Sequence, residues 1–180
     1  MIIYTEHISP RLKFIANFIV GELLGMEYSI TNNEDEINGS GKAVINYSKN
    51  KELPGFHINP HGLLSETGIT QREIQIEAEG EFPIFYQTEG KDLDFDIFSA
   101  SFFLLTRYEE YSHAKGDKYG RYKASNSLAS QNNFLHLPII NIWTEKLRSL
   151  LLTQFPEMVH KRIPASFSLS LDIDNPWAHL

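Results

Sequence analysis

The sequence of 180 residues contains no cysteine, which excludes a disulfide framework, a thiolate nucleophile and every zinc site built on sulfur ligands. Basic residues are also scarce: 16 Lys and Arg stand against 23 Asp and Glu, which leaves a formal net charge of −7. Neither a nucleic acid nor an anionic membrane is an expected partner, because binding to either requires a basic face.

Long apolar runs are missing as well. The two most apolar stretches, residues 14–20 and 97–105, are far shorter than the roughly 20 residues that cross a bilayer. The N-terminus also lacks the basic region and apolar core of a signal peptide. We therefore expect no membrane association and a cytoplasmic location.

The residues that are present suit a folded α/β domain, since 42% are hydrophobic and 12% are aromatic. Three short apolar segments are typical of buried strands: residues 2–5, 26–31 and 43–48. Between the first two, Ser9 and Pro10 begin a helix that Gly25 ends. Strand, helix and strand in succession form a βαβ unit with parallel strands. The sequence thus predicts a mixed, mainly parallel sheet flanked by helices in a Rossmann-like three-layer fold.

The middle of the chain predicts a β-hairpin inserted into this fold. Residues 72–79 alternate between apolar and polar side chains, as a strand with one solvated face does. A turn after this strand would lead into residues 82–87 as its antiparallel partner.

Two further helices are expected. Asp96 caps a helix that should run to about Tyr111, with a buried first half in which Phe102 and Leu105 are nearly inaccessible. A second, amphipathic helix begins at Pro138.

The last segment predicts a domain boundary. Residues 166–171 alternate like a strand, and Asn175 with Pro176 has the pattern of a helix start. A single turn of helix is not stable alone, so a following domain should continue it. We therefore expect an N-terminal α/β domain over residues 1–165 and the start of a truncated second domain over residues 166–180.

Two carboxylates follow that expected strand. Asp172 and Asp174 lie two residues apart, so both side chains can project from one face. Like charges held this close raise one pKa or recruit a cation. The alternative interpretation is structural, with Asp174 capping the turn and Asp172 in solvent.

A second group of candidate ligands is formed by His57, His61 and Glu66. Two histidines four residues apart would suit a metal on a helix. Pro60 and Gly62 argue against a helix, so a turn in which the two rings do not converge is favoured.

The charged residues Arg107, Glu109 and Glu110 come at the end of the helix that Asp96 caps. An ion pair between Arg107 and Glu110, three positions apart, is the simpler interpretation. The alternative is a ligand pocket or interface shared with His61 and Glu66, which requires their loop to face this end of the helix.

Five segments carry a family resemblance: residues 3–6, 60–68, 96–111, 134–138 and 172–174. Together they resemble the uncharacterised N-terminal region of bacterial polysaccharide deacetylase-like proteins, which are carbohydrate esterases. In such proteins this region precedes a metal-dependent domain, similar to a distorted (β/α) barrel, that removes acetyl groups from sugars.

The last of these segments is similar to the opening motif of that catalytic domain, Thr-Phe-Asp-Asp-Gly-Pro. The resemblance implies that Asp172 is the catalytic base and that Asp174 binds the metal. Here Ile173 separates the two carboxylates and changes the angle between them. The family's two metal-binding histidines would lie beyond Leu180. A divalent metal, zinc or similar, is therefore expected only in the full-length parent and not in this chain.

These observations lead to one interpretation and one alternative. The chain is interpreted as a non-catalytic accessory domain of a deacetylase-like hydrolase. Its expected partners are the downstream catalytic domain of the same chain and a carbohydrate. The alternative is a free-standing α/β module that binds a small ligand or is purely structural.

Overall fold

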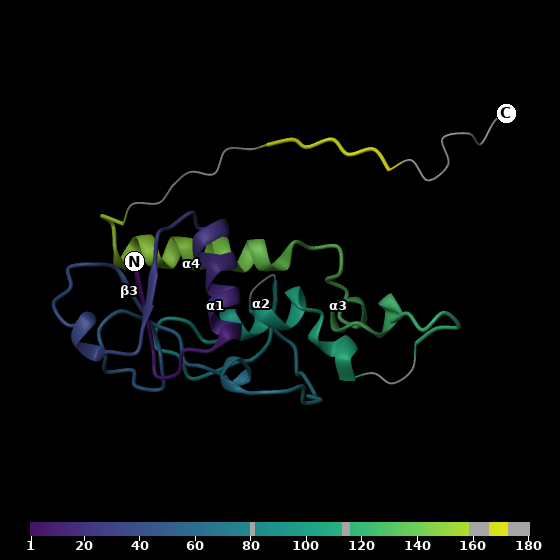
Figure 1. The fold of residues 1–180 in the computed structure, drawn as a ribbon, viewed down its shortest axis with the longest axis horizontal. Coiled ribbons are helices and arrows are strands. Elements are labelled where there is room, and N and C mark those ends of the chain that lie inside the picture. The colour runs from purple at the N-terminus through teal and green to yellow at the C-terminus, as the bar shows by residue number, and fades with distance from the viewer. Residues whose placement is uncertain (80–81, 113–115, 159–165, 173–180) are drawn as a thin grey trace.

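The computed structural model describes residues 1–79, 82–112, 116–158 and 166–172. A four-stranded sheet has the order β2-β1-β3-β4, and each neighbouring pair of strands is parallel. Its strand β3 lies at the left of Figure 1. The strands are β1 (Ile2–Thr5), β2 (Ser29–Thr31), β3 (Val44–Tyr47) and β4 (Phe56–His57). The predicted α/β class and the parallel pairing of β1 with β2 are confirmed.

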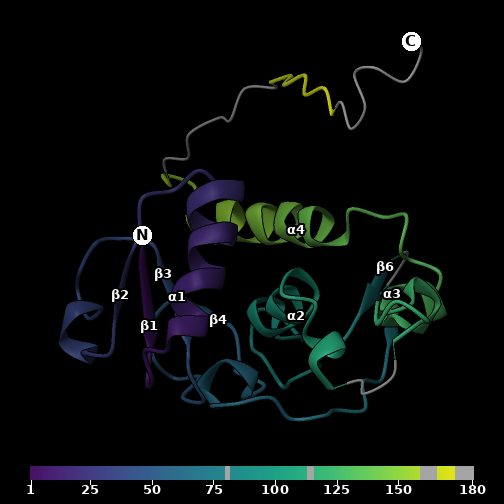
Figure 2. The same cartoon turned by 45° about the vertical axis from the view of Figure 1, so that its right-hand side comes forward.

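The connection from β1 to β2 is helical, with α1 (Pro10–Ala16) continuing into the π-helix η1 (Asn17–Leu23). It begins where predicted, because the Ser9 hydroxyl accepts a hydrogen bond from the Leu12 N–H at 3.0 Å. It ends before Gly25, whose φ of 68° lies in the left-handed region that glycine adopts easily. Figure 2 shows α1 standing beside β1 and β3, with α2 next to it and α4 along the top.

Helix α2 (Ile97–Leu105) is buried over most of its length. Phe98 is fully enclosed, and its ring packs edge-on against Tyr47 with the centroids 5.3 Å apart. Phe102 is 8% exposed, as predicted. The prediction for Leu105 is wrong, because this side chain is 37% exposed.

The same helix ends earlier than the sequence predicted. Arg107 has a φ of 52°, a left-handed conformation that interrupts the α-helix well before Tyr111. A short 3₁₀ helix, η4 (Tyr108–Ser112), follows the break. Leu105 is therefore the last residue of α2, where the chain turns away from the core.

Helix α4 (Ile139–Gln154) follows Pro138 as predicted and joins the central core to a second sheet. That sheet consists of β5 (Glu77–Glu79) and β6 (Phe82–Ile84), which pair antiparallel. The buried Trp143 of α4 donates its indole N–H to the Pro83 carbonyl at 3.1 Å. Residues 71–76 have no regular structure, so β5 is shorter than the strand predicted from residue 72.

The remaining helices are short: η2 (Glu34–Glu36), η3 (Leu63–Ser65), η5 (Ala124–Asn126) and α3 (Leu128–Gln131). Across the described ranges, no helix combines the length and the apolar character needed to cross a membrane.

The strand predicted at residues 166–171 does not form. Residues 166–172 have no regular structure, and Phe167, Leu169 and Leu171 are 88%, 72% and 78% exposed. No strand elsewhere in the described part of the chain pairs with this segment, so its apolar side chains have nothing to pack against. Asp174 and the helix expected after Asn175 lie outside the described residues.

Candidate functional site

The order of the strands creates a crevice at the carboxyl ends of the two central strands, β1 and β3. The chain leaves β1 for β2 on one side and places β3 and β4 on the other, so β1 and β3 flank a topological switch point. In open α/β sheets, ligands bind at the carboxyl ends of the strands beside such a point.

A cavity of about 290 Å³ occupies this position, and we term it the switch-point cavity. It contains the ends of β1 and β3 at Thr5 and Tyr47, and the first residues of α1 close one side with Leu12. The other residues that line it come from the loops after β1 and β3, from the loop before η3 and from η3 itself: Glu6, His7, Lys49, Pro60, His61, Gly62, Leu64 and Ser65. Both charged and apolar groups therefore face the same space.

The loop that carries His61 is held by a buried carboxylate. The His61 N–H donates to Asp96 Oδ2 at 2.8 Å, and the Tyr47 hydroxyl donates to the same oxygen at 2.8 Å. The Ser99 hydroxyl also donates to Oδ2, at 2.6 Å, and the Ser99 N–H donates to Oδ1 at 2.9 Å. Burial raises the pKa of Asp96, while the hydrogen bonds from Ser99, His61 and Tyr47 act in the opposite direction. Asp96 thus joins β3, the His61 loop and α2.

The other histidine of the predicted pair has a structural role. His57 is buried, and its Nδ1 accepts a hydrogen bond from the Lys91 N–H at 3.0 Å. Its Nε2 must then carry the proton that is donated to the Ser48 carbonyl at 2.9 Å. Both ring nitrogens are occupied, so His57 does not offer a metal ligand. No group of three or more His, Cys, Asp or Glu side chains that could hold a metal occurs among residues 1–79, 82–112, 116–158 and 166–172.

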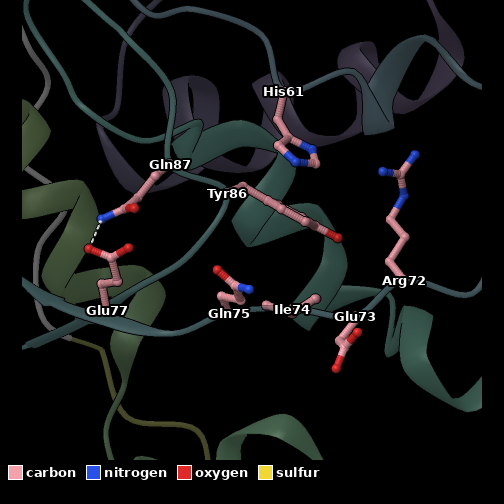
Figure 3. A pocket seen from close by; sticks show the side chains of 8 residues that line it. All are labelled: His61, Arg72, Glu73, Ile74, Gln75, Glu77, Tyr86 and Gln87. Carbon is pink, nitrogen blue, oxygen red and sulfur yellow. Dashed lines mark hydrogen bonds between the residues drawn. The ribbon is translucent and has the colours of Figure 1, made fainter.

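A second cavity lies on another side of His61, and we term it the Tyr86 cavity. Its volume is about 430 Å³, and it is lined by His61, Arg72, Glu73, Ile74, Gln75, Glu77, Tyr86 and Gln87 (Figure 3). The His61 and Tyr86 rings stack with their centroids 4.1 Å apart and an interplanar angle of 25°. Across the cavity, Gln87 donates a hydrogen bond to Glu77 at 2.7 Å.

Four buried polar atoms near this cavity have no hydrogen-bond partner among the residues that the structure describes: His61 Nδ1, Glu66 Oε2, Arg72 Nε and the Tyr86 hydroxyl. Glu66 and Arg72 form an ion pair through their other atoms. Burial lowers the pKa of His61, so its imidazole is neutral at pH 7. Burial also raises the pKa of Tyr86, which keeps its hydroxyl protonated.

The predicted site residues divide into separate groups. His61 lines both cavities, and Glu66 joins the Tyr86 cavity through its ion pair with Arg72. Arg107 and Glu110 pair with each other, as the simpler interpretation held, and line a different cavity of about 530 Å³.

The shared pocket that was the alternative is not assembled around Arg107. Glu109 also lines the 530 Å³ cavity, and its carboxylate accepts a hydrogen bond from the Leu128 N–H at 2.8 Å. From this end of the helix, Tyr108 reaches the loop after Glu66, where its hydroxyl accepts from the Thr70 N–H at 3.0 Å, and Glu109 lines a further cavity together with residues 70–74.

Of the two aspartates predicted from the resemblance, Asp172 is the one within the described residues, and it lines none of these cavities. Asp172 is exposed on the irregular segment 166–172, and Asp174 falls outside the described residues. Tyr86 and Arg72 were missed by the sequence analysis, because neither stands in a recognisable motif. Asp96 was identified only as a helix cap, although a capping aspartate that precedes an apolar helix could have suggested a buried carboxylate.

Comparison with known proteins gives one match. Residues 1–156 match a family described as a family of unknown function, DUF7033. No curated protein and no solved structure matches the chain.

Proposed function

We propose that this chain, which belongs to the DUF7033 family of unknown function, is a non-catalytic accessory domain. It binds a small polar ligand in the switch-point cavity. In the full-length parent it would precede a deacetylase-like, metal-dependent catalytic domain. The finer fold that we propose is a Rossmann-like three-layer arrangement in which β5 and β6 form an inserted hairpin.

One observation supports ligand binding above all: the switch-point cavity lies where parallel sheets bind ligands. Lys49 and Glu6 supply opposite charges there, and His61 and Ser65 supply hydrogen-bonding groups. Such a mixture of few polar groups with apolar walls is typical of small-molecule sites.

The arrangement favours binding over catalysis. Asp96 is the buried carboxylate nearest the His61 loop, and both of its oxygens already accept hydrogen bonds from protein donors. It therefore suits holding the loop in place better than exchanging a proton with a ligand.

The link to a deacetylase rests on the family resemblance. It implies a carbohydrate as the ligand of the parent and the downstream domain as the partner of this one. It also implies that Asp172 is the base and Asp174 the ligand of a divalent metal in that domain. The metal would polarise a water molecule that attacks an amide or ester carbonyl.

The test is a titration of the ¹⁵N-labelled chain with N-acetylglucosamine and its short oligomers, followed by NMR. We expect chemical-shift changes at the carboxyl ends of β1 and β3, and a loss of affinity in Lys49→Ala. The matched control is Lys51→Ala, an exposed lysine that does not line the cavity. Equal affinity of the two variants would contradict binding in the switch-point cavity.

A second experiment separates the accessory role from that of a free-standing module. Lys49→Ala in the full-length parent should lower kcat/KM for an acetylated oligosaccharide without changing the metal content. An unchanged kcat/KM, together with ligand binding by the isolated chain, would favour the free-standing module.

A further inference from the structure

The Tyr86 cavity contains more buried polar atoms than its own residues can pair. Tyr86 is only 7% exposed, and its hydroxyl has no partner within the described chain. Arg72 Nε and His61 Nδ1 are also buried and have no hydrogen-bond partner within the described chain. Buried polar groups in folded proteins are almost always hydrogen-bonded, so these atoms point to an occupant that supplies the missing partners.

The backbone at Tyr86 is strained, and its neighbours hold it in place. Tyr86 has a φ of 58°, a backbone conformation that residues other than glycine rarely adopt. Its carbonyl accepts a hydrogen bond from the Asp96 N–H at 2.9 Å. The preceding Phe85 is fully buried against Trp143 and Phe103, with ring centroids 5.6 Å and 5.8 Å away. Strained backbone conformations that the surrounding structure holds in place are most frequent at ligand-binding and active sites.

This conformation aims the tyrosine ring at the cavity. The ring lies against the His61 imidazole, and its hydroxyl points toward the side on which Arg72 stands (Figure 3). Ile74 and the tyrosine ring give the cavity an apolar surface, and Gln75 and Gln87 add amide groups that both donate and accept.

The charges around the cavity select against anions. The Arg72 guanidinium is already paired with Glu66, while Glu73 and Glu77 add two further carboxylates to the lining. An anion would be repelled by these carboxylates, whereas a neutral molecule avoids this cost.

The unpaired atoms are a mixture of donors and acceptors. Arg72 Nε can only donate, His61 Nδ1 can accept when Nε2 carries the ring proton, and the Tyr86 hydroxyl can do either. A hydroxyl group matches such a mixture because it donates and accepts at once. The volume of about 430 Å³ lies within the roughly 300–1,000 Å³ of small-molecule sites.

We propose that the Tyr86 cavity binds a neutral, hydroxyl-rich ring of monosaccharide size, which hydrogen-bonds to Tyr86, Arg72 and His61. This site is separate from the switch-point cavity and goes beyond the proposed function. His61 lies between the two sites and is the one side chain that lines both.

The experiment uses the whole chain, titrated with D-glucose and with its anionic counterpart D-glucuronate, and followed by NMR. We expect shifts at Tyr86 and Gln87 with glucose, and weaker binding of glucuronate. Tyr86→Phe removes only the hydroxyl and should weaken glucose binding about tenfold, the effect of one hydrogen bond of ordinary strength. The same variant should melt at an equal or higher temperature without sugar, because it deletes an unpaired buried polar group.

The control is Tyr119→Phe, at a tyrosine that is 67% exposed, and it should leave the affinity for glucose unchanged. Lys49→Ala tests whether glucose binds in the switch-point cavity instead. Absence of glucose binding, equal or tighter binding of glucuronate, or an unchanged affinity in Tyr86→Phe would each overturn the proposal. If Lys49→Ala alone weakened binding, the sugar would occupy the switch-point cavity, which would overturn this proposal and support the proposed function.

Discussion

His61 makes the stability of the domain depend on pH. Burial lowers its pKa, the nearby Asp96 partly offsets this effect, and Arg72 adds to it. The unfolded chain therefore takes up a proton near pH 6.5, at which the folded state still holds a neutral imidazole. The contribution of His61 to stability is fully present above about pH 6.5 and decreases as the pH falls toward the lower pKa of the folded state.

The corresponding experiment compares the wild-type chain with His61→Gln in denaturant melts at several values between pH 5 and 8. We expect the wild-type free energy of unfolding to decrease more steeply below about pH 6.5 than that of the variant. Parallel pH profiles would show that His61 is not the group responsible.

A second prediction at the residue scale concerns Asp96. Both of its oxygens accept hydrogen bonds, and two of the four donors are the backbone N–H groups of His61 and Ser99. In Asp96→Asn, either orientation of the amide turns an NH₂ group toward one of these N–H groups. We expect a loss of about 1–3 kcal/mol in the free energy of unfolding at pH 7, measured in urea. A variant as stable as the wild type would mean that relief from burying the charge compensates fully for the lost hydrogen bond.

At the scale of elements, the two ends of α2 differ in how deeply their side chains are buried. Phe98 is fully buried against Tyr47, and Phe98→Ala should cost about 3–5 kcal/mol. Leu105 closes the helix at 37% exposure, so Leu105→Ala should cost less than about 1 kcal/mol. Equilibrium unfolding of the two variants tests the comparison. Similar losses would show that the end of α2 is more enclosed than its exposure indicates.

At the scale of the whole molecule, the apolar segment 166–172 is expected to contribute nothing to stability. Its large side chains are exposed, whereas Met158 still packs against the core. A variant with Phe167, Leu169 and Leu171 all replaced by Ser should unfold within about 0.5 kcal/mol of the wild type, as changes at exposed positions generally do. Calorimetry of both chains measures this difference. A substantially lower melting temperature of the variant would show that the segment docks on the domain.

Local patterns were sufficient to predict the main elements of the central fold. Apolar runs located β1 and β3, and Ser9 with Pro10 marked the start of α1. These signals are reliable because capping and hydrophobic period act between residues only a few positions apart. Where the signal depended on distant partners, the prediction failed. Residues 166–171 have the alternation of a strand but no neighbouring strand in the described structure.

The candidate site could be predicted only in part. The sequence singled out His61 and Glu66, identified Asp96 as a cap and favoured the ion pair between Arg107 and Glu110 that the structure contains. It did not predict that the α-helix breaks at Arg107, because no local pattern indicates the left-handed backbone there.

By itself, the sequence determined the α/β class, the parallel βαβ unit and the two ends of the helical connection between β1 and β2, since each follows from interactions between near neighbours in the chain. Only the tertiary structure decided that Arg72 and Tyr86 join His61 around one cavity. These residues come from different loops, and their meeting depends on how α2, α4 and the second sheet pack together. Packing of this kind sums many weak contacts between distant segments, which a pattern along the chain does not record.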